Sequence, residues 1–443
     1  MIRMTQATLK QLHKLRQEAA KVQYDYMTER HVIKANHPQF ALLMWRSHQA
    51  NNLYNYALYL VRHAIFKQNW LSYNQLEKEL KEQRNQKSSM VYDYLGNAHL
   101  TQQILKLVLQ NMMSWSKARK AYAKDPSRFR GRPKLPKYKT KGGLGIVIVD
   151  NQTAKLKNGQ VVIPTLDYLT IKLQHQHATK IQQVRIVPQH NTFIVEVVYK
   201  TKHVIAYKPD NGRYLGIDPG LNNAFTLASN VKGVIPEVIN GKALKAFNQY
   251  YNKRKAHLAS AHALAHQPYL SKSMQLLNQQ RYHKVMKFSH ESSKHVVEYA
   301  LRHDLNTIVI GYSVDLKHAS KMGTRNNQNF INIPHKAIID KIIYKANLAG
   351  IVVLLTSEEF TSQTSFLDQE EPIAANGNKA RQAAQLVPAV RRVKRGLFKA
   401  STGQKINADV NGALQILKKV VPNAFSNGIV GVGLHPVKVQ INF

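Results

Sequence analysis

The chain has 443 residues, and its 64 lysines and arginines against 25 acidic residues give a formal net charge of +39. Such an excess repels itself in a compact molecule, so we expect a polyanionic partner whose phosphates neutralise it. The absence of cysteine excludes disulfides, thiolate zinc sites and cysteine nucleophiles. No apolar run approaches the roughly 18 to 20 residues of a membrane span, so we expect a cytoplasmic protein of roughly two to three domains.

The first part of the chain has helical periodicity. Apolar residues recur three and four apart over residues 39–67, and the same pattern predicts helices at 73–86 and 100–124. Prolines at 126, 133 and 136 exclude a regular helix from the stretch that follows. That stretch is a predicted basic loop, with the cationic residues Arg128, Arg130, Arg132, Lys134, Lys137, Lys139 and Lys141.

Short β-branched segments come next and predict an antiparallel β module. Its strands are expected at residues 145–150, 160–164, 169–173, 181–188 and 192–199. The alternation of apolar residues in the last two strands predicts one buried face, with residues 189–191 as the hairpin connection.

The second half of the chain alternates strands with helices. Strands are predicted at 214–217, 224–228, 307–310 and 351–355, and helices at 243–266, 271–303, 334–349 and 408–420. This order favours an α/β sheet covered on its faces.

The scarce acidic residues include several at the ends of predicted elements. Asp218 ends an apolar strand before a glycine turn, Asp409 lies in the first turn of a helix, and Glu358 and Glu359 follow another strand. Each could be purely structural, because aspartates cap turns and helix dipoles favour an acidic first turn. Together they suit magnesium or manganese, which prefer oxygen ligands, and two such ions about 4 Å apart catalyse phosphodiester hydrolysis.

The sequence Gly216-Ile217-Asp218-Pro219-Gly220, followed by Ala224-Phe225-Thr226, resembles the first motif of a RuvC-type nuclease. Asn407-Ala408-Asp409-Val410-Asn411-Gly412-Ala413 resembles the third. Both are similar to transposon-encoded TnpB proteins, which are RNA-guided DNA endonucleases and relatives of the compact type V CRISPR effectors. Residues 52–58 and 126–138 resemble the same family, so the likeness covers nearly the whole chain.

The resemblance implies an α/β RuvC/RNase H-like nuclease domain and an N-terminal β module (WED-like) with an inserted helical module (REC-like). The implied boundaries are 1–38 and 145–211 for the β module, 39–144 for the helical module, and 212–443 for the nuclease domain.

The sequence departs from the family at the second catalytic position. Gly311 stands where the strand at 307–310 would usually be followed by a glutamate. We expect Glu358 to replace it, because the two strands should be neighbours about 4.8 Å apart. Glu359 is the second choice, since strand alternation turns only one of the pair toward the metals, and Asp315 is a poorer candidate beyond the strand end.

A second departure concerns zinc, because residues 364–368 hold no cysteine where the family usually carries a four-cysteine ribbon. We expect the target-nucleic-acid-binding loop at 360–403 to persist without zinc. By resemblance, Tyr54 and Asn55 contact the flanking DNA motif, although Tyr54 could equally pack in the core. The predicted nucleic-acid contacts, each of which could instead be a solvated basic residue, are Arg128, Arg130, Arg132, Lys134, Lys137, Arg392, Lys394 and Arg395.

The resemblance thus implies an RNA-guided DNA endonuclease, with a guide RNA from the transposon end and double-stranded target DNA beside a flanking motif. Asp218, Glu358 and Asp409 would hold two Mg²⁺ ions, or Mn²⁺, for phosphodiester hydrolysis. The main alternative is a nuclease-inactive RNA-guided repressor of transcription, which Gly311 favours. A third is a nucleic-acid-binding protein that uses no guide.

Overall fold

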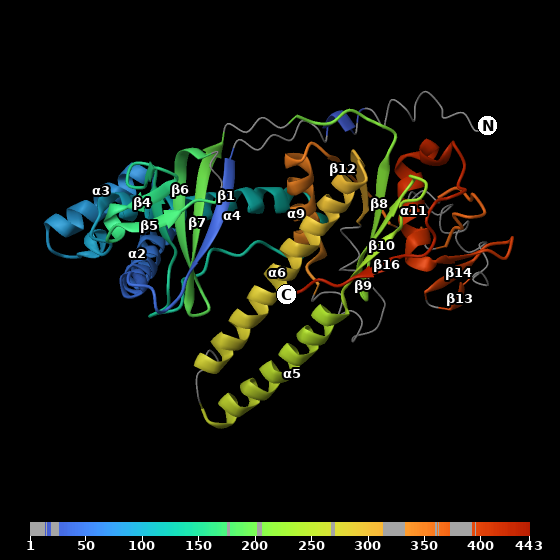
Figure 1. Ribbon diagram of the computed structural model, residues 1–443. Helices are drawn as coiled ribbons and strands as arrows, with labels where there is room; N and C mark the ends of the chain where they lie inside the picture. Colours follow the sequence, from blue (N-terminus) through green and yellow to red (C-terminus); the bar gives the residue numbers. More distant parts are fainter. Residues whose placement is uncertain are drawn as a thin grey trace. The chain divides into compact units, whose positions relative to one another are not determined.

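The computed structural model describes residues 14, 16–18, 26–174, 178–201, 206–266, 271–312, 333–358, 361, 363–372, 392–394 and 396–443. The chain forms two compact units (Figure 1). The N-terminal unit is Tyr24–His203, and the C-terminal unit combines Val204–Phe443 with Met1–Gln23. None of the described helices is long and apolar enough to cross a membrane.

A four-stranded antiparallel sheet organises the N-terminal unit, in the order β1-β7-β6-β2. Its strands are β1 (Tyr26–Ile33), β2 (Val147–Asp150), β6 (Ala178–Gln189) and β7 (Thr192–Thr201). The sequence did not predict β1, because Glu29 and Arg30 interrupt its apolar pattern. The structure pairs it with β7, so residues 26–33 join strands more than 100 residues away.

Three helices lie between β1 and β2 in the sequence and share the core of this unit. They are α2 (Phe40–Phe66), α3 (Tyr73–Asn85) and α4 (Ala98–Lys124), and their ends lie within two residues of the predicted ones. A second, three-stranded sheet comprises β3 (Lys155–Lys157), β4 (Gln160–Ile163) and β5 (Leu169–Lys172).

The β6–β7 hairpin is tighter than predicted. Gln189 pairs with Thr192, which leaves His190 and Asn191 as a two-residue connection with φ values of 42° and 51°. Positive φ at both positions suits the right-handed twist of a hairpin. The predicted alternation is seen in β6 at Val184 and Ile186, but in β7 residues 192–197 are all buried, including Glu196, which pairs with Arg30 and Arg185.

A six-stranded sheet organises the C-terminal unit, in the order β12-β11-β8-β9-β10-β16. β8 (Tyr214–Pro219), β9 (Asn223–Ser229) and β10 (Glu237–Asn240) form an antiparallel meander. β11 (Thr307–Gly311) is parallel to β8, and β12 (Val352–Thr356) is parallel to β11. The short β16 (Val437–Val439), which was not predicted, closes the other edge. The structure confirms the α/β sheet that the alternation of strands and helices predicted. The sheet is mixed, because it contains both parallel and antiparallel strand pairs.

Helices cover both faces of this sheet. Ile217 and Ile310 pack in a core with residues of α6 (Lys272–Arg302) and α9 (His335–Leu348). On the other face, Val309 and Val352 pack against Ile416 and Leu417, which belong to α11 (Ala408–Val420). A small sheet of β13 (Arg392–Lys394), β14 (Leu397–Lys399) and β15 (Lys405–Asn407) leads directly into α11.

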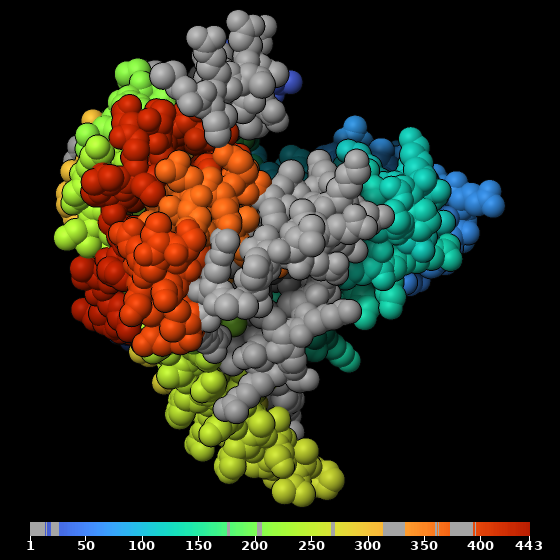
Figure 2. Space-filling view, turned by 90° about the vertical axis from the view of Figure 1, so that its right-hand side faces the viewer, coloured from blue at the N-terminus to red at the C-terminus, as the bar shows by residue number. Residues whose placement is uncertain are grey.

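The helices α5 (Lys242–Leu264) and α6 form a long antiparallel pair, whose far ends project from this unit (Figure 2). The pair is joined by polar contacts: the Tyr251 hydroxyl donates to Asn278 Oδ1 at 2.7 Å, and Arg281 Nε donates to Asn248 Oδ1 at 3.1 Å.

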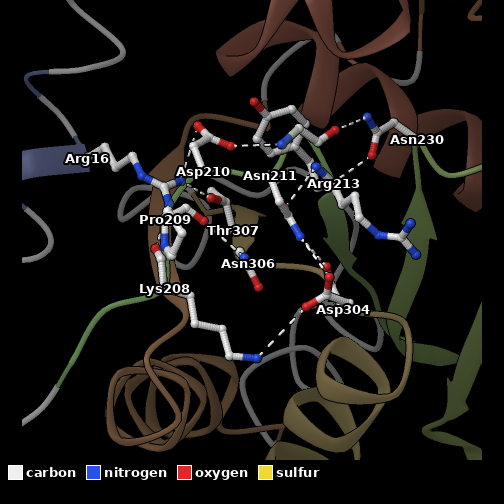
Figure 3. Close-up of polar contacts among 12 residues, drawn as sticks. Arg16, Lys208, Pro209, Asp210, Asn211, Arg213, Asn230, Asp304, Asn306 and Thr307 are labelled. Carbon is white, nitrogen blue, oxygen red and sulfur yellow. Dashed lines mark hydrogen bonds and ion pairs between the residues drawn. The ribbon is translucent and has the colours of Figure 1, made fainter.

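A polar network lies at the amino-terminal ends of β8 and β11 (Figure 3). These ends are opposite the carboxyl ends near which Asp218 and Glu358 lie. Arg16 pairs with Asp210 at 3.3 Å and donates to the Lys208 carbonyl and to Thr307 Oγ1. Asn306 Nδ2 donates to the Pro209 carbonyl at 2.9 Å. These contacts tie the described N-terminal residue Arg16 to the start of the six-stranded sheet.

Candidate active site

Asp218 lies near the carboxyl end of β8, on the face that α11 covers. Alternate strand residues share a face, and a Cβ added to Gly216 would lie 2.2 Å from the Ala413 carbonyl oxygen of α11. Two residues further on, Asp218 Oδ2 would lie 2.7 Å from a Cβ on Gly412. The carboxylate of Asp218 therefore occupies the space beside α11 that the absent side chain of Gly412 leaves open.

Asp409 lies one turn of α11 before Gly412. The Asn407 side chain caps this helix by accepting hydrogen bonds from the backbone N–H groups of Asp409 and Val410. Asn223, at the start of β9, donates from Nδ2 to Asp409 Oδ2 at 2.5 Å. The turn between β8 and β9 therefore holds one carboxylate oxygen of Asp409.

Buried His335 fixes the same turn from the other side. Its Nε2 lies 2.9 Å from the Gly220 carbonyl oxygen, so it donates a hydrogen bond there. Its ring packs edge-on against Phe225, with 5.9 Å between centroids. The β8–β9 turn is therefore anchored to the first turn of α9.

Glu358 follows β12 and lies beside Gly311, the last residue of β11. A Cβ added to Gly311 would be 3.1 Å from the Cβ of Glu358 and 2.5 Å from Ile416 Cδ1 of α11. Because Ile310 pairs with Ile217, Gly311 and Asp218 come next on parallel neighbouring strands, about 4.8 Å apart. Glu358 thus lies at the edge of the sheet where a side chain at position 311 would begin.

The three predicted carboxylates are arranged along one helix. From its N-terminus, α11 contacts Asn223 through Asp409, Asp218 through Gly412, and the neighbourhood of Glu358 through Ile416. Lys419, one turn further, donates from Nζ to the Ser357 carbonyl at 3.0 Å. Helix residues three and four apart lie on one face, so one face of α11 carries Asp409 and faces Asp218 and the neighbourhood of Glu358.

The donor chemistry of Asp218, Glu358 and Asp409 fits a hard divalent cation, which takes carboxylate oxygens. Across the described residues, no group of three or more acidic or histidine side chains is arranged to hold a metal ion. The structure therefore places the carboxylates next to the same helix without forming a closed chelate. Glu359 and Asp315 lie outside the described residues.

Hydrogen bonds and aromatic packing hold the segment at 364–368. Buried Asn411 donates to the Thr364 carbonyl at 2.8 Å and accepts from the Phe366 N–H at 2.9 Å. The rings of Phe366 and Phe425 are 4.7 Å apart. Asp368 Oδ1 accepts from the Ser401 N–H at 2.9 Å, which connects this segment to the turn after β14.

The predicted nucleic-acid contacts fall in two places. Arg128, Arg130, Arg132, Lys134 and Lys137 are exposed on the N-terminal unit, and Lys394 is exposed in β13. Arg392 is in β13, but its side chain, like the whole of Arg395, lies outside the described residues.

Tyr54 and Asn55 make internal contacts in the N-terminal unit. Tyr54 is 4% exposed in the core, and its hydroxyl accepts from Asn111 Nδ2 at 2.9 Å. Asn55 donates to the Lys139 carbonyl at 3.0 Å and accepts from the Lys139 N–H at 2.8 Å.

Sequence reasoning missed two supporting residues, Asn223 and Asn411. Asn223 is a polar residue between a glycine turn and an apolar strand, and Asn411 interrupts the apolar pattern of α11. The sequence shows a polar residue in an apolar context at each position. It does not show the hydrogen-bond partner of either amide, because those partners come from distant segments.

Two family models match consecutive parts of the chain. One, OrfB_IS605, is described as a probable transposase and matches residues 194–317. The other is described as a Cas12f1-like TNB domain and matches residues 335–416. These matches confirm, over the residues they cover, the resemblance to TnpB-like proteins and compact type V effectors that the motifs indicated.

No curated protein matches the chain. Among solved structures, a Cas12f1–sgRNA–target DNA complex aligns at 16% identity, covering 88% of this chain and 98% of that one, with a TM-score of 0.34. A CRISPR–Cas12f ternary complex aligns at 14% identity over 85% and 81%, with a TM-score of 0.35. C2c1 of Alicyclobacillus acidoterrestris with single-guide RNA aligns at 9% identity over 94% and 69%, with a TM-score of 0.33.

Proposed function

We propose that this protein is an RNA-guided DNA endonuclease of a transposon, which cleaves target DNA next to a short flanking motif. The observation that carries the proposal is the position of Glu358. Its Cβ lies 3.1 Å from where the Cβ of a residue larger than Gly311 would be. This proximity supports Glu358 as the replacement for the glutamate that the family usually has at the end of this strand, although Glu358 follows a different strand.

Asp218, Glu358 and Asp409 are the proposed metal ligands. Bound Mg²⁺ would supply an activated water and stabilise the departing 3′ oxygen. Asp218 reaches the site from β8 beside Gly412, and Asn223 holds one oxygen of Asp409. This hydrogen bond restricts the orientation of the Asp409 carboxylate.

The proposed partners are a guide RNA from the transposon end and a double-stranded DNA target in the cytoplasm of a prokaryote. Pairing between guide and target would supply sequence specificity, while the protein reads the backbone and the flanking motif. The formal charge of +39 supports this assignment, since two nucleic-acid strands in one complex need dense neutralisation.

The test is cleavage of a plasmid by the protein purified with its co-expressed RNA, with Mg²⁺ present. Asp218→Asn, Glu358→Gln and Asp409→Asn should each slow cleavage about 100-fold or more, equivalent to about 2.7 kcal/mol of activation energy. Asp340→Asn is the matched control, because exposed Asp340 pairs with exposed Lys336 across a helix surface at 3.6 Å. Cleavage that survives all three changes would refute the site.

The alternative is an RNA-guided repressor without nuclease activity. Gly311 favours it, because the carboxylate that the family usually has at the end of this strand is missing there. It predicts guide-dependent DNA binding that is equal in the parent protein and Glu358→Gln, with no cleavage by either. A protein that uses no guide would bind DNA equally well after its RNA is removed.

A further inference from the structure

The basic loop of the N-terminal unit, residues 126–145, is fastened at several points, and we name it the basic strap. Near its start, the rings of Phe129 and Tyr122 of α4 are 5.7 Å apart. Trp115 of α4 donates from Nε1 to the Pro133 carbonyl at 3.3 Å. The guanidinium of Arg62 of α2 stacks 4.8 Å from the ring centroid of Tyr138. The strap therefore has contacts with two helices.

A row of polar residues on α2 holds the second half of the strap. Ser47, Asn51 and Asn55 are four residues apart and so lie on one helix face. Asn55 makes two hydrogen bonds with the backbone of Lys139, and Asn51 Nδ2 donates to the Thr140 carbonyl at 2.9 Å. The Ser47 hydroxyl donates to the Gly145 carbonyl, and the Ser47 backbone carbonyl accepts from the Gly145 N–H at 2.8 Å.

The fit between this row and the strap is close. Asn51 and Ser47 are fully buried. A Cβ on Gly145 would lie 2.6 Å from the backbone nitrogen of Asn51. Buried amides need partners, because an unpaired one costs about 1–3 kcal/mol. The Ser47 hydroxyl, Asn51 Nδ2 and both amide atoms of Asn55 bind strap backbone, whereas buried Asn51 Oδ1 has no hydrogen-bond partner among the described residues.

The cationic side chains of the strap divide into two kinds. Six are exposed, namely Arg128, Arg130, Arg132, Lys134, Lys137 and Lys141. Lys139 is different, because its Nζ lies 4.4 Å from the ring centroid of Tyr54. Burial lowers the pKa of Lys139 below its ordinary value. Anchoring of the backbone at 133 and 138–145 therefore leaves the other cations facing solvent.

We propose that the polar row Ser47, Asn51 and Asn55 is a positioning device that holds the basic strap as a track for a nucleic-acid backbone. Arg130, Arg132 and Lys134 are all exposed and are separated by single residues, so the strap presents several cations close together to the phosphates of one backbone. Lys139 contributes to the packing of the track and not to phosphate binding.

The inference gives Asn55 a role other than reading DNA bases. An asparagine that recognises adenine uses its Oδ1 and Nδ2 atoms together. In Asn55 both atoms already bind the backbone of Lys139. Base reading would require breaking both bonds, so Asn55 acts on nucleic acid through the strap.

The first test compares Lys137→Ala with Lys139→Ala in the full chain, purified without RNA. The probe is a 20-base-pair RNA–DNA heteroduplex of arbitrary sequence, titrated at several salt concentrations. Lys137→Ala should reduce the slope of log affinity against log salt by about 0.7–0.9, the loss of one phosphate contact, whereas Lys139→Ala should leave the slope unchanged. Equal slope changes in the two variants would contradict the distinction between exposed cations that bind phosphate and Lys139, which packs against Tyr54.

The second test compares Asn55→Ala with Asn52→Ala, an exposed neighbour on the same helix. Asn55→Ala should weaken heteroduplex binding about three- to tenfold, as expected for the loss of about one hydrogen bond's stabilisation. It should also speed tryptic cleavage within residues 130–141 under native conditions, while Asn52→Ala does neither. If Asn55→Ala instead changed the preference among DNA duplex sequences and left trypsin sensitivity unchanged, Asn55 would be a base-reading residue.

This inference rests on the nucleic-acid partners of the proposed function, but it can fail separately. Neither binding test needs cleavage, guide RNA or metal. If the protein cleaves DNA but Lys137→Ala and Lys139→Ala change the salt dependence of binding equally, the role of the strap is refuted and the nuclease is not. If the protein does not cleave DNA but the slopes change as expected, only the proposed nuclease activity is refuted.

Discussion

Glu358 and Gly311 share one space at the edge of the six-stranded sheet, because a Cβ on Gly311 would lie 3.1 Å from the Cβ of Glu358. A side chain at position 311 and the present conformation of Glu358 would therefore compete. The relationship supports the proposal that Glu358, which follows β12, replaces a glutamate at the end of β11. The two strands are hydrogen-bonded in parallel, with Gly311 opposite Thr356.

The first prediction exchanges the two positions. Glu358→Gly should reduce plasmid cleavage about 100-fold or more, and the double variant Gly311→Glu with Glu358→Gly should recover at least about tenfold of that loss. Removing the Glu358 side chain frees part of the space, and the end of the Ile416 side chain, 2.5 Å from a Cβ at position 311, has to rotate away for the new glutamate to fit. The control is Gly311→Gln with Glu358→Gly, which has the same shape without the charge. Equal recovery in that control would show that packing, and not a carboxylate, is restored.

The second prediction concerns Gly412, whose added Cβ would lie 2.7 Å from Asp218 Oδ2. Gly412→Ala should displace the Asp218 carboxylate and reduce cleavage at least about tenfold. The helix itself should not suffer, because alanine is favoured over glycine within a helix by about 1 kcal/mol. Thermal unfolding should therefore stay near that of the parent. Gly396→Ala is the control, since its Cβ would meet nothing within 4 Å, and equal activity of both variants would contradict the prediction.

The third prediction tests the hydrogen bond from Asn223 to Asp409. Asn223→Ala should lower cleavage about 10- to 100-fold, the usual loss when a residue that orients a metal ligand is removed. The concentration of Mn²⁺ needed for half-maximal cleavage should rise as well, which a simple loss of folded protein would not cause. Asn222→Ala removes the neighbouring amide, whose Oδ1 accepts from Lys245. A loss of activity that is the same in both variants would assign the effect to the turn rather than to Asp409.

The fourth prediction concerns Glu77, which joins α3 to α4 in the N-terminal unit. Its Oε1 accepts hydrogen bonds from Tyr92 and Gln102 and pairs with Lys81, each at 2.9 Å. Burial alone would raise the pKa of Glu77, but these hydrogen bonds outweigh it and lower the pKa to about 2 from 4.5. The folded state thus binds this proton more weakly than the unfolded chain. The stabilisation by Glu77 is complete above about pH 4.5 and disappears as the pH falls toward 2.

The measurement is urea unfolding of the parent and Glu77→Gln between pH 2 and 7. All three tryptophans lie in the N-terminal unit, so their fluorescence reports on that unit within the intact protein. The two proteins should differ most above pH 5 and converge near pH 2. A constant difference across the range would show that Glu77 acts through packing. Lys78→Gln, which removes an exposed i,i+4 pair with Glu82, should behave like the parent.

Local patterns predicted most helices and strands because periodicity records which side of an element is buried. The ends of α2, α3 and α4 lie within two residues of those predicted. The same reasoning failed for β1 and β16, which are short or contain charged residues. Glu29 is a buried carboxylate that accepts from the Tyr199 hydroxyl at 3.2 Å. A pattern based on hydrophobicity cannot show a buried charge whose partner is 170 residues away.

The sequence by itself determined the charge, the lack of cysteine, the element types and the positions of Asp218 and Asp409 at the ends of their elements, because these depend on composition and local spacing. Only the tertiary structure decided that Glu358 lies against Gly311, that Asn223 binds Asp409, and that Asn55 binds the backbone of the basic strap. Each of these contacts joins segments that are 47 to 186 residues apart. Such contacts form only when elements pack, since side chains find their partners after the sheet and its helices have set the distances between them.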